Sequence, residues 1–321
     1  MKRRTLVRAA LALAVAAIAV PAAVLAPYAL RVRHVAADPA HGFRADFYLY
    51  VPPAVRAAAR AAPAAILVQP NNSGITTDDD AKQRRDAWWM GFGRKPLADR
   101  LGVVLLVPAF PRRATDWRVY THALDRDVLT TDRPDLARLD LQLVAMIDRA
   151  RADLAAAGVP TRDRVLLQGF SASGMFANRF TALHPARVLA VAAGSPGGWP
   201  IAPVAAYAGE PLPYPAGIAD LDSLAGAPFD TAAYRRVPQL VVMGDRDDND
   251  GLDFEDGWDR DAAARVERLF GRTPVERWSR AESLYRAAGA DARFVLVAGV
   301  GHDRRRLQDR STRFIEDVLR R

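Results

Sequence analysis

The sequence predicts an α/β fold in which helices flank a mostly parallel central sheet. Short apolar runs alternate along the chain with longer segments of helical periodicity, which is the pattern of such folds. Several of the short runs are too apolar to have one face in water. The chain has 321 residues, half of them hydrophobic, which is enough to bury the core of one large domain or two smaller ones.

Seven apolar runs are predicted to be strands. The run from Val103 to Val107 contains no polar residue, as expected of a central strand that is buried on both faces. The predicted strands are Phe43–Val51, Ala64–Pro70, Val103–Phe110, Arg164–Phe170, Val188–Gly194, Gln239–Asp245 and Arg293–Gly299.

Two longer segments between or after these runs are predicted helices. Apolar residues recur at helical spacing in Pro134–Ala157, and Gly158 follows as an expected C-terminal cap. The segment Leu307–Leu319 is predicted to be a closing helix. The apolar residues of the first helix are Leu136, Leu139, Leu143 and Met146.

Residues 195–237 interrupt this rhythm with many Pro and Gly residues. The segment is too long for an ordinary loop. We therefore expect a cap-like insertion over the C-terminal edge of the sheet, where open α/β folds bind their ligands. A long surface excursion without a role is the alternative.

The N-terminus has the character of an export segment. A basic start is followed by an uncharged stretch from Ala9 to Leu30. Val20-Pro21-Ala22 offers the small residues of a signal-peptidase site, whereas the whole stretch is long enough for an N-terminal membrane anchor. The sequence predicts a signal peptide or anchor in residues 1–37 and a catalytic domain in residues 38–321. The protein is then secreted, periplasmic or anchored at the outer face of the cytoplasmic membrane.

Charge and composition exclude several functional classes. The formal net charge is +8, but six basic residues precede the first acidic residue, Asp38, and the rest of the chain mixes Arg with Asp. This distribution does not favour a nucleic-acid partner. The chain has no cysteine, which excludes disulfides, thiolate metal sites and a cysteine nucleophile. No cofactor and no metal site are predicted, because the acidic stretch after residue 245 does not match a calcium loop.

The stretch "RVLLQGFSASGMFANRF" indicates a serine nucleophile. Ser171 stands between a predicted strand and a predicted helix, with Gly169 two residues before it and Ser173 two residues after it. A serine on such a tight strand-to-helix turn needs small residues at both positions. Ser173 as nucleophile would bring Met175 to the second small position and would lie inside the helix. Ser171 is therefore the predicted nucleophile, with an N-cap role as the alternative.

A serine hydroxyl needs a histidine base and a carboxylate that orients the base, in the chain order Ser, acid, His. His302 is the only histidine beyond Ser171 that directly follows a predicted strand. The acid follows the strand before it, among Asp245, Asp247, Asp248 and Asp250, with Asp247 preferred.

The oxyanion of acyl transfer also needs hydrogen-bond donors. The backbone N–H of Ala172 is one expected donor. The second is expected from the loop after the strand Ala64–Pro70, with Asn72 preferred over Asn71, because Asn tolerates left-handed backbone geometry. A plain turn is the alternative.

These motifs together resemble the α/β-hydrolase family, within it the secreted esterase and polyester-depolymerase-like branch. The resemblance rests on "FYLYVPPA", "GFSASGMFANRF", "MGDRDDND" and "VAGVGHD", and it covers the chain from about Phe43 onward. It implies that Ser171, Asp247 and His302 are nucleophile, acid and general base. The chain departs from the family where Ser173 replaces the usual Gly and where Pro70-Asn71-Asn72 replaces a common His-Gly pair.

The sequence thus predicts an exported serine hydrolase that cleaves carboxylic esters, small or polymeric, through an acyl-enzyme. A peptidase or acyltransferase on the same fold is one alternative, and a non-catalytic binding protein at the cell surface is another. Trp117 and Trp199 are candidates for the walls of a substrate pocket, with packing as the alternative role.

Overall fold

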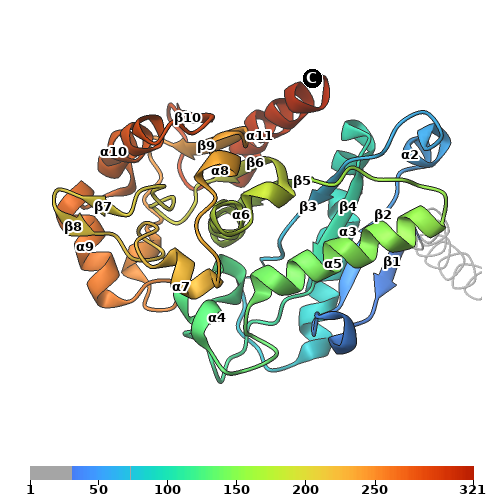
Figure 1. Ribbon diagram of the computed structural model, residues 1–321, viewed down its shortest axis with the longest axis horizontal. Helices are drawn as coiled ribbons and strands as arrows, with labels where there is room; N and C mark the ends of the chain where they lie inside the picture. Colours follow the sequence, from blue (N-terminus) through green and yellow to red (C-terminus); the bar gives the residue numbers. More distant parts are fainter. Residues whose placement is uncertain (1–30, 73) are drawn as a thin grey trace, which may run out of the picture.

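The structure is a computed structural model, which describes residues 31–72 and 74–321. In these residues the main sheet has eight strands in the order β1-β2-β4-β3-β5-β6-β9-β10 (Figure 1). Strands β1 and β2 pair antiparallel, as do β2 and β4, and all later pairs are parallel. The predicted mostly parallel sheet is confirmed. Its strands are β1 Val32–Val35, β2 Phe47–Tyr50, β3 Ile66–Val68, β4 Val104–Pro108, β5 Val165–Phe170, β6 Val188–Gly194, β9 Gln239–Gly244 and β10 Ala292–Val297.

Strand β1 lies where the sequence predicts the end of an export segment. Val32 pairs with Tyr50 of β2, and Val35 pairs with Phe47. The sheet therefore begins at residue 32, and the predicted domain start at residue 38 is too late. The predicted signal peptide or anchor otherwise falls on residues 1–30, which lie outside the described residues. Among the helices of residues 31–72 and 74–321, none combines the length and apolar character that a membrane span requires.

Helices cover both faces of the sheet. Helices α3 and α11 contact each other and pack on one face, and α5 and α6 pack on the other. The described α-helices are α2 Pro53–Ala58, α3 Asp80–Leu101, α4 Arg126–Thr130, α5 Leu139–Ala156, α6 Ala172–Leu183, α7 Leu221–Ala225, α8 Thr231–Arg235, α9 Arg260–Phe270, α10 Pro274–Ala287 and α11 Arg304–Leu319. Short 3₁₀ turns lie at η1 Pro39–His41, η2 Thr121–Ala123, η3 Pro185–Arg187 and η4 Gly251–Asp253.

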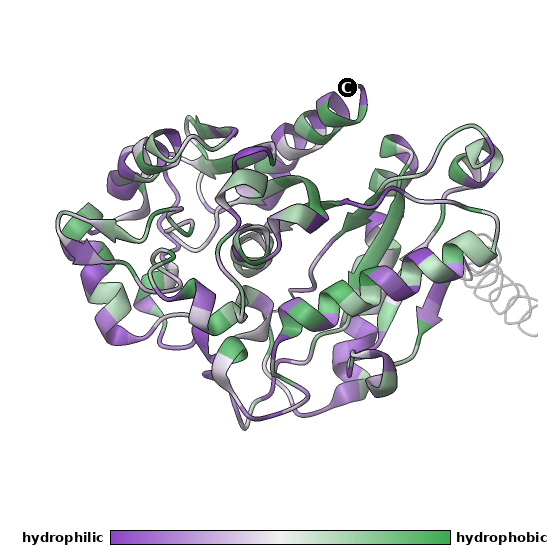
Figure 2. Cartoon of the chain, viewed as in Figure 1, coloured by the Kyte–Doolittle hydropathy of each residue, from purple (hydrophilic) through white to green (hydrophobic). Residues whose placement is uncertain are grey.

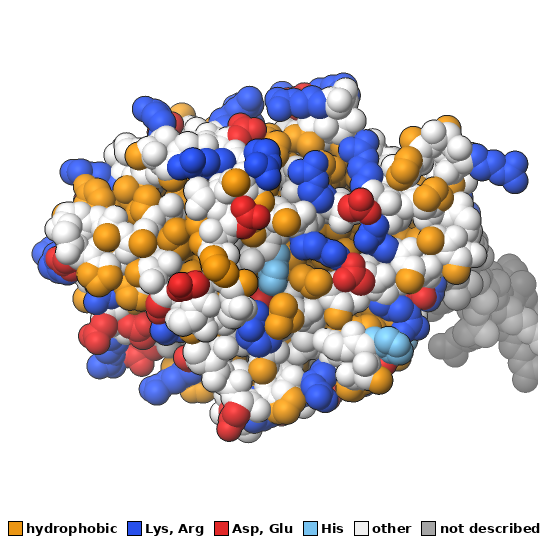
Figure 3. Space-filling view, viewed as in Figure 1, with side chains coloured by type: hydrophobic (Ala, Val, Ile, Leu, Met, Phe, Trp, Pro, Cys, Tyr) orange, Lys and Arg blue, Asp and Glu red, His pale blue; other side chains and the backbone are white. Residues whose placement is uncertain are grey.

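The central strands are buried on both faces, as their apolar sequences predict. Side chains alternate along β3, so that Ile66 and Val68 pack toward α5 and α6, whereas Leu67 packs toward α3 and α11. All three are fully buried. In Figure 2 the strands are mostly hydrophobic, whereas the helices alternate hydrophobic and hydrophilic residues. Basic and acidic side chains are intermixed over the face seen in Figure 3.

The segment 195–237 contains a small hairpin and two short helices. The hairpin consists of β7 Ala206–Tyr207 and β8 Glu210–Pro211, and α7 and α8 follow it. The hairpin lies beside α9 (Figure 1), where the ring of Tyr207 is 4.9 Å from that of Phe270. The segment thus packs against the C-terminal part of the chain.

A buried carboxylate ties the start of α5 to the end of α6. Asp140 is fully buried, and its oxygens accept hydrogen bonds from the Arg138 guanidinium at 3.0 and 2.8 Å and from His184 Nε2 at 2.8 Å. Burial alone would raise the pKa of Asp140. The hydrogen bonds and charges of His184 and Arg138 outweigh it and lower the pKa to about 2. The predicted helix start at residue 134 is too early, because Arg138 adopts φ 47° and α5 begins after it.

Replacing Asp140 with Asn is expected to lower the free energy of unfolding at pH 7 by roughly 3–5 kcal/mol, because Arg138 then loses its buried partner. The pKa of Asp140 is lower in the folded than in the unfolded protein, so the ionised carboxylate adds about 2 kcal/mol to the free energy of unfolding. This contribution is complete above the unfolded pKa and is lost as the pH falls from about 5 to about 2. Urea unfolding over this pH range measures both effects. Asp148→Asn is the matched control, because that half-exposed carboxylate forms a surface ion pair worth at most about 1 kcal/mol. Equal losses in the two variants would contradict the assignment.

Candidate active site

Ser171 is the single residue between β5 and α6. Its backbone has φ 58° and ψ −128°, a conformation that a residue with a side chain rarely adopts. Hydrogen bonds on both sides hold it there. The Ser171 N–H donates to Gly194 O of β6 at 2.9 Å, and Ser171 O accepts from the Met175 N–H at 2.9 Å. A serine in this strained strand-to-helix turn has the geometry of a nucleophile elbow.

Two glycines allow the turn to close. A Cβ on Gly169 would lie 2.0 Å from the backbone oxygen of Ser173, and a Cβ on Gly174 would lie 2.5 Å from Gly194 O. Both clashes are with backbone atoms, so a side chain at either position would force the turn or the packing of α6 on β6 to open. Gly169 is the small residue that the sequence analysis requires two positions before the serine.

Replacing Gly169 with Ala is expected to lower the free energy of unfolding by roughly 3 kcal/mol or more, since the added methyl group overlaps backbone that cannot turn away. Gly93→Ala is the matched control. Gly93 lies inside α3 with no atom within 4 Å of the added Cβ, and Ala at this position should stabilise the helix by about 0.5–1 kcal/mol. Chemical denaturation of both variants measures the change in the free energy of unfolding. The prediction fails if this change has the same sign in the two variants.

Ser173 has a different role from Ser171. Its side chain is buried, its Oγ accepts the Phe170 N–H at 3.0 Å and its hydroxyl donates to Phe170 O at 2.9 Å. The hydroxyl therefore bridges the two backbone groups of the residue before Ser171. Ser173 completes the turn from inside the helix, which explains why a serine is accommodated where glycine is common.

The four acidic candidates after β9 have four different surroundings. Asp247 is buried, and its oxygens lie 3.0 and 3.1 Å from His302 Nδ1. Asp245 accepts the Gly299 N–H at 2.7 Å, Asp250 forms a buried ion pair with Arg277, and Asp248 is exposed. Of the four, Asp247 is thus the one in hydrogen-bond contact with the predicted base.

The electrostatics at Asp247 favour its ionised form. Burial alone would raise the pKa of this carboxyl, but the hydrogen bond from His302, the neighbouring Ser195, and the charge of His302 bring the pKa below its usual value. The Ser195 hydroxyl is buried and lies near the Asp247 carboxylate without reaching hydrogen-bond geometry in the structure. Ser195, which follows β6 and has φ 41°, is a residue of the site that no sequence motif indicated.

His302 follows β10 and lines the same cavity as Ser171. Its ring lies 4.6 Å from the Phe170 ring, and its side chain is 23% exposed. Since Nδ1 faces Asp247, Nε2 is the nitrogen left to face a reacting hydroxyl. The cavity has a volume of about 920 Å³ and extends from Ser171 and His302 along α3 and the start of α11. The structure brings the base and the acid into contact and places the base in the cavity of Ser171.

Comparison with known proteins decides the fold. No protein-family model and no curated protein sequence matches the chain. Among solved structures, poly(aspartic acid) hydrolase-1 from Sphingomonas sp. KT-1 is similar with 18% identity and a TM-score of 0.57, over 84% of this chain and 93% of the other. The poly(3-hydroxybutyrate) depolymerase LpqC from Bordetella parapertussis is similar with 22% identity and a TM-score of 0.54, over 88% and 91%. This chain has the α/β-hydrolase fold.

Two of the three predicted oxyanion donors lie beside Ser171 or line its cavity. Ala172 is the first residue of α6, so its N–H has no acceptor within the helix. Asn72 lines the cavity, and its Nδ2 donates to Phe170 O at 3.4 Å. Asn71 instead is buried with its side chain on the end of β4, where Nδ2 donates to Phe110 O at 2.9 Å and Oδ1 accepts the Phe110 N–H at 3.2 Å.

Neither predicted tryptophan is among the described residues that line the cavity of Ser171 and His302. Trp199 is buried, stacks on the Phe270 ring at 4.3 Å and donates from Nε1 to Ala216 O at 2.9 Å. Trp117 is exposed beside Arg118. The structure therefore does not bring them to the predicted pocket wall. A different tryptophan, Trp89 of α3, lines the cavity and is 56% exposed.

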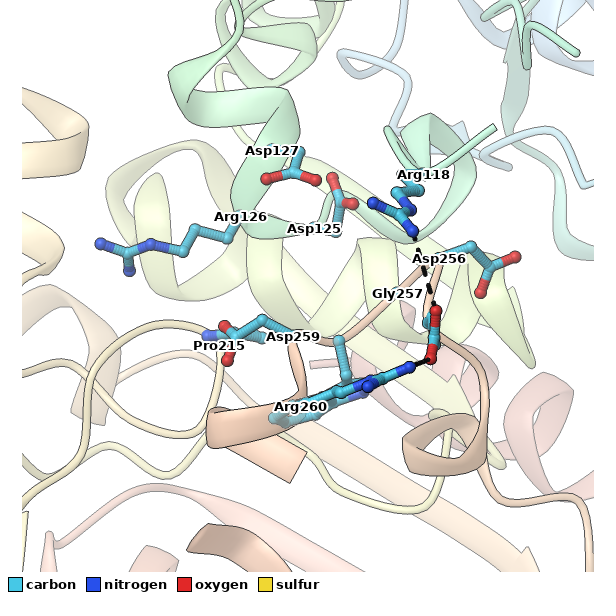
Figure 4. Close-up of a pocket in the computed structure, with 11 residues that line it drawn as sticks. Arg118, Asp125, Arg126, Asp127, Pro215, Asp256, Gly257, Asp259 and Arg260 are labelled. Atoms are coloured by element: carbon cyan, nitrogen blue, oxygen red, sulfur yellow. Dashed lines mark hydrogen bonds and ion pairs between the residues drawn. The ribbon is translucent and has the colours of Figure 1, made fainter. Parts of the chain in front are cut away.

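A second cavity of about 510 Å³ lies between α4 and the start of α9 and carries charges of both signs (Figure 4). Its charged groups are largely engaged within the protein. Glu255 pairs with Arg260 and with Arg118, the latter at 3.9 Å, and Asp125 caps α4 by accepting the Val128 N–H at 3.0 Å. In residues 31–72 and 74–321 no group of three His, Asp or Glu side chains is arranged to hold a metal ion. Ser171 and His302 do not line this second cavity.

Proposed function

We propose that this protein is a serine hydrolase that cleaves carboxylic esters through an acyl-enzyme. The observation that carries the proposal is that Ser171 and His302 line one cavity. Behind it, Nδ1 of His302 lies 3.0 Å from a carboxylate oxygen of the buried Asp247. The α/β-hydrolase fold and its similarity to a structure described as a poly(3-hydroxybutyrate) depolymerase support an ester as substrate. No cofactor is invoked.

In the proposed mechanism, Ser171 Oγ attacks the ester carbonyl carbon while its proton passes to His302 Nε2. The carbonyl oxygen becomes an oxyanion, which the Ala172 N–H and the Asn72 amide stabilise by about 3 kcal/mol for each donor. Collapse of this intermediate breaks the bond to the alcohol oxygen, and His302 returns the proton to the leaving alcohol. His302 then deprotonates a water that attacks the acyl carbon. Collapse of this second intermediate breaks the bond to Ser171 Oγ and frees the acid, and His302 returns the proton to Ser171 Oγ. Asp247 holds the proton on His302 Nδ1 and stabilises the imidazolium that forms when Nε2 is protonated.

A fluorophosphonate probe tests the proposal, because it reacts with an activated serine and with no other feature of the fold. We expect labelling of Ser171, located by mass spectrometry, and turnover of p-nitrophenyl esters of short acyl chains. Peptide p-nitroanilides and an added alcohol acceptor separate peptidase and acyltransferase activity from ester hydrolysis. A folded protein that neither reacts with the probe nor turns over any of these substrates would be a non-catalytic binding protein, and the proposal would be wrong.

We further propose that the protein is exported through its N-terminal segment, either cleaved or retained as an anchor. The basic start and the uncharged stretch from Ala9 to Leu30 support this. Because β1 begins at Val32, cleavage near Val20-Pro21-Ala22 would leave the sheet whole. Cell fractionation of the full chain and N-terminal sequencing of the product test the proposal, and activity confined to the cytoplasm would overturn it.

A further inference from the structure

Three arginines line the cavity of Ser171 and His302 without a carboxylate partner. Arg94 comes from α3, and Arg304 and Arg305 are the first two residues of α11. In residues 31–72 and 74–321, no carboxylate oxygen lies within 4.0 Å of any of the three guanidinium groups. Elsewhere in the chain, by contrast, the buried Arg112 and Arg277 each form an ion pair with an aspartate.

Arg94 is the most confined of the three. Its Nη1 donates to Gln308 Oε1 at 2.6 Å, which is a neutral acceptor on α11. Burial, and then the charge of Arg304, lower the pKa of Arg94 to about 10. Arg94 is partly buried, whereas Arg304 and Arg305 are exposed. A partly buried guanidinium that lies near a second one and is bound to a neutral amide lacks the charge compensation that such groups normally have. An anionic ligand in the cavity would supply this missing negative charge.

The charge of the three arginines is offset only in part by an acidic side chain of the described lining residues. Asp303 is the one carboxylate among the described lining residues, and its Oδ1 caps α11 by accepting the N–H groups of Arg305 at 2.8 Å and Arg306 at 3.2 Å. Three guanidinium groups thus stand against one carboxylate, which also caps the positive end of α11. The field in the cavity therefore favours a negative group beside the nucleophile.

The same cavity also has an apolar wall. Trp89 and Met90 of α3 and Leu307 of α11 line it next to the arginines. A volume of about 920 Å³ is larger than a short acyl group needs. The cavity thus has room for an apolar chain that extends from the ester to a charged end.

We propose that the ester cleaved at Ser171 carries a carboxylate, which Arg94, Arg304 and Arg305 bind while the apolar part of the substrate lies on Trp89, Met90 and Leu307. This inference rests on the proposed esterase function and adds the substrate class. Guanidinium groups bind carboxylates through paired, charge-assisted hydrogen bonds, which makes them suited to this task.

The test compares two p-nitrophenyl esters of equal chain length, the adipate monoester, which ends in a carboxylate, and the hexanoate, which ends in a methyl group. The readout is the ratio of kcat/KM for adipate to kcat/KM for hexanoate, after subtraction of spontaneous hydrolysis. We expect the double variant Arg304→Gln/Arg305→Gln to lower this ratio about tenfold, and Arg94→Gln to lower it by a similar factor. Added salt should lower the ratio of the unchanged protein, because screening weakens the attraction.

Arg313→Gln is the matched control, since Arg313 is an exposed arginine of α11 outside the cavity, and it should leave the ratio unchanged. The inference is overturned if the double variant and Arg94→Gln both keep the ratio of the unchanged protein. It is also overturned if fluorophosphonate labels Ser171 but neither ester is hydrolysed. In that case the protein would still be a serine hydrolase, but its substrate would belong to another class. A folded protein that is neither labelled nor active would overturn the proposed function, and this inference with it.

Discussion

Replacing Ser171 with Ala is expected to lower kcat/KM for p-nitrophenyl esters by about 10⁵- to 10⁶-fold. The substitution removes the one atom that forms the acyl-enzyme, so that only oxyanion binding and substrate positioning remain. Ala must adopt the same positive φ of 58° as the serine that it replaces. The backbone strain is therefore the same in both proteins, and the melting temperature should change by only a few degrees. Steady-state kinetics and thermal unfolding measure the two quantities.

Ser173→Ala is the control for this variant, because it removes a hydroxyl two residues away. Loss of the bridge to the N–H and C=O of Phe170 should lower the free energy of unfolding by about 1–3 kcal/mol. Fluorophosphonate should still label Ser171 in this variant. Labelling that survives in Ser171→Ala and disappears in Ser173→Ala would show that the nucleophile was assigned to the wrong serine.

Replacing Asp247 with Asn is expected to lower kcat by about 10⁴-fold, although the shape of the side chain is retained. The carboxylate accepts the Nδ1–H of His302 with both oxygens within 3.1 Å. An amide in its place can turn its NH₂ group toward Nδ1, which leaves the proton of His302 on Nε2. In that tautomer Nε2 cannot take the proton of Ser171. Single-turnover kinetics with a p-nitrophenyl ester measure the acylation step directly.

Asp248→Asn is the matched control, since it changes the same atoms in the neighbouring exposed residue. It should retain activity within about twofold, because surface substitutions of this kind have small effects. Comparable losses in Asp248→Asn and Asp247→Asn would mean that the loop acts through its overall charge, and would contradict the specific role of Asp247.

The central strands and the turn at Ser171 could be predicted from the sequence, because both depend on residues that are close together in the chain. Apolar runs buried on both faces identify the central strands, and Gly169 with a strand before it and a helix after it identifies the elbow. Strand β1 could not be predicted, because only its end residues Val32 and Val35 are buried, with two exposed residues between them, and because it directly follows the uncharged N-terminal stretch. Only its pairing with β2, through contacts about 15 residues away, makes it a strand.

The walls of the cavity could not be predicted for a related reason. Trp199 is buried by Phe270, which lies 71 residues further along the chain, so that its role depends on where α9 packs. Trp89 and Arg94 belong to α3, whose polar and apolar residues follow no clear stripe and which contains Pro96. One signal was available, since Arg304 and Arg305 follow His302 almost directly. A basic pair so close to a predicted base indicates charge at the site.

Helix α11 begins with residues that line the cavity, and in Figure 1 it extends from the edge of the sheet to the C-terminus. With a rise of about 1.5 Å per residue, the last helical residue, Leu319, lies about 22 Å along the helix from the arginine pair. A substitution or a label placed at the far end of α11, near Leu319, is therefore separated from the cavity by the length of the helix. The far end of α11 is a place where a spectroscopic label can be attached without entering the cavity of Ser171 and His302.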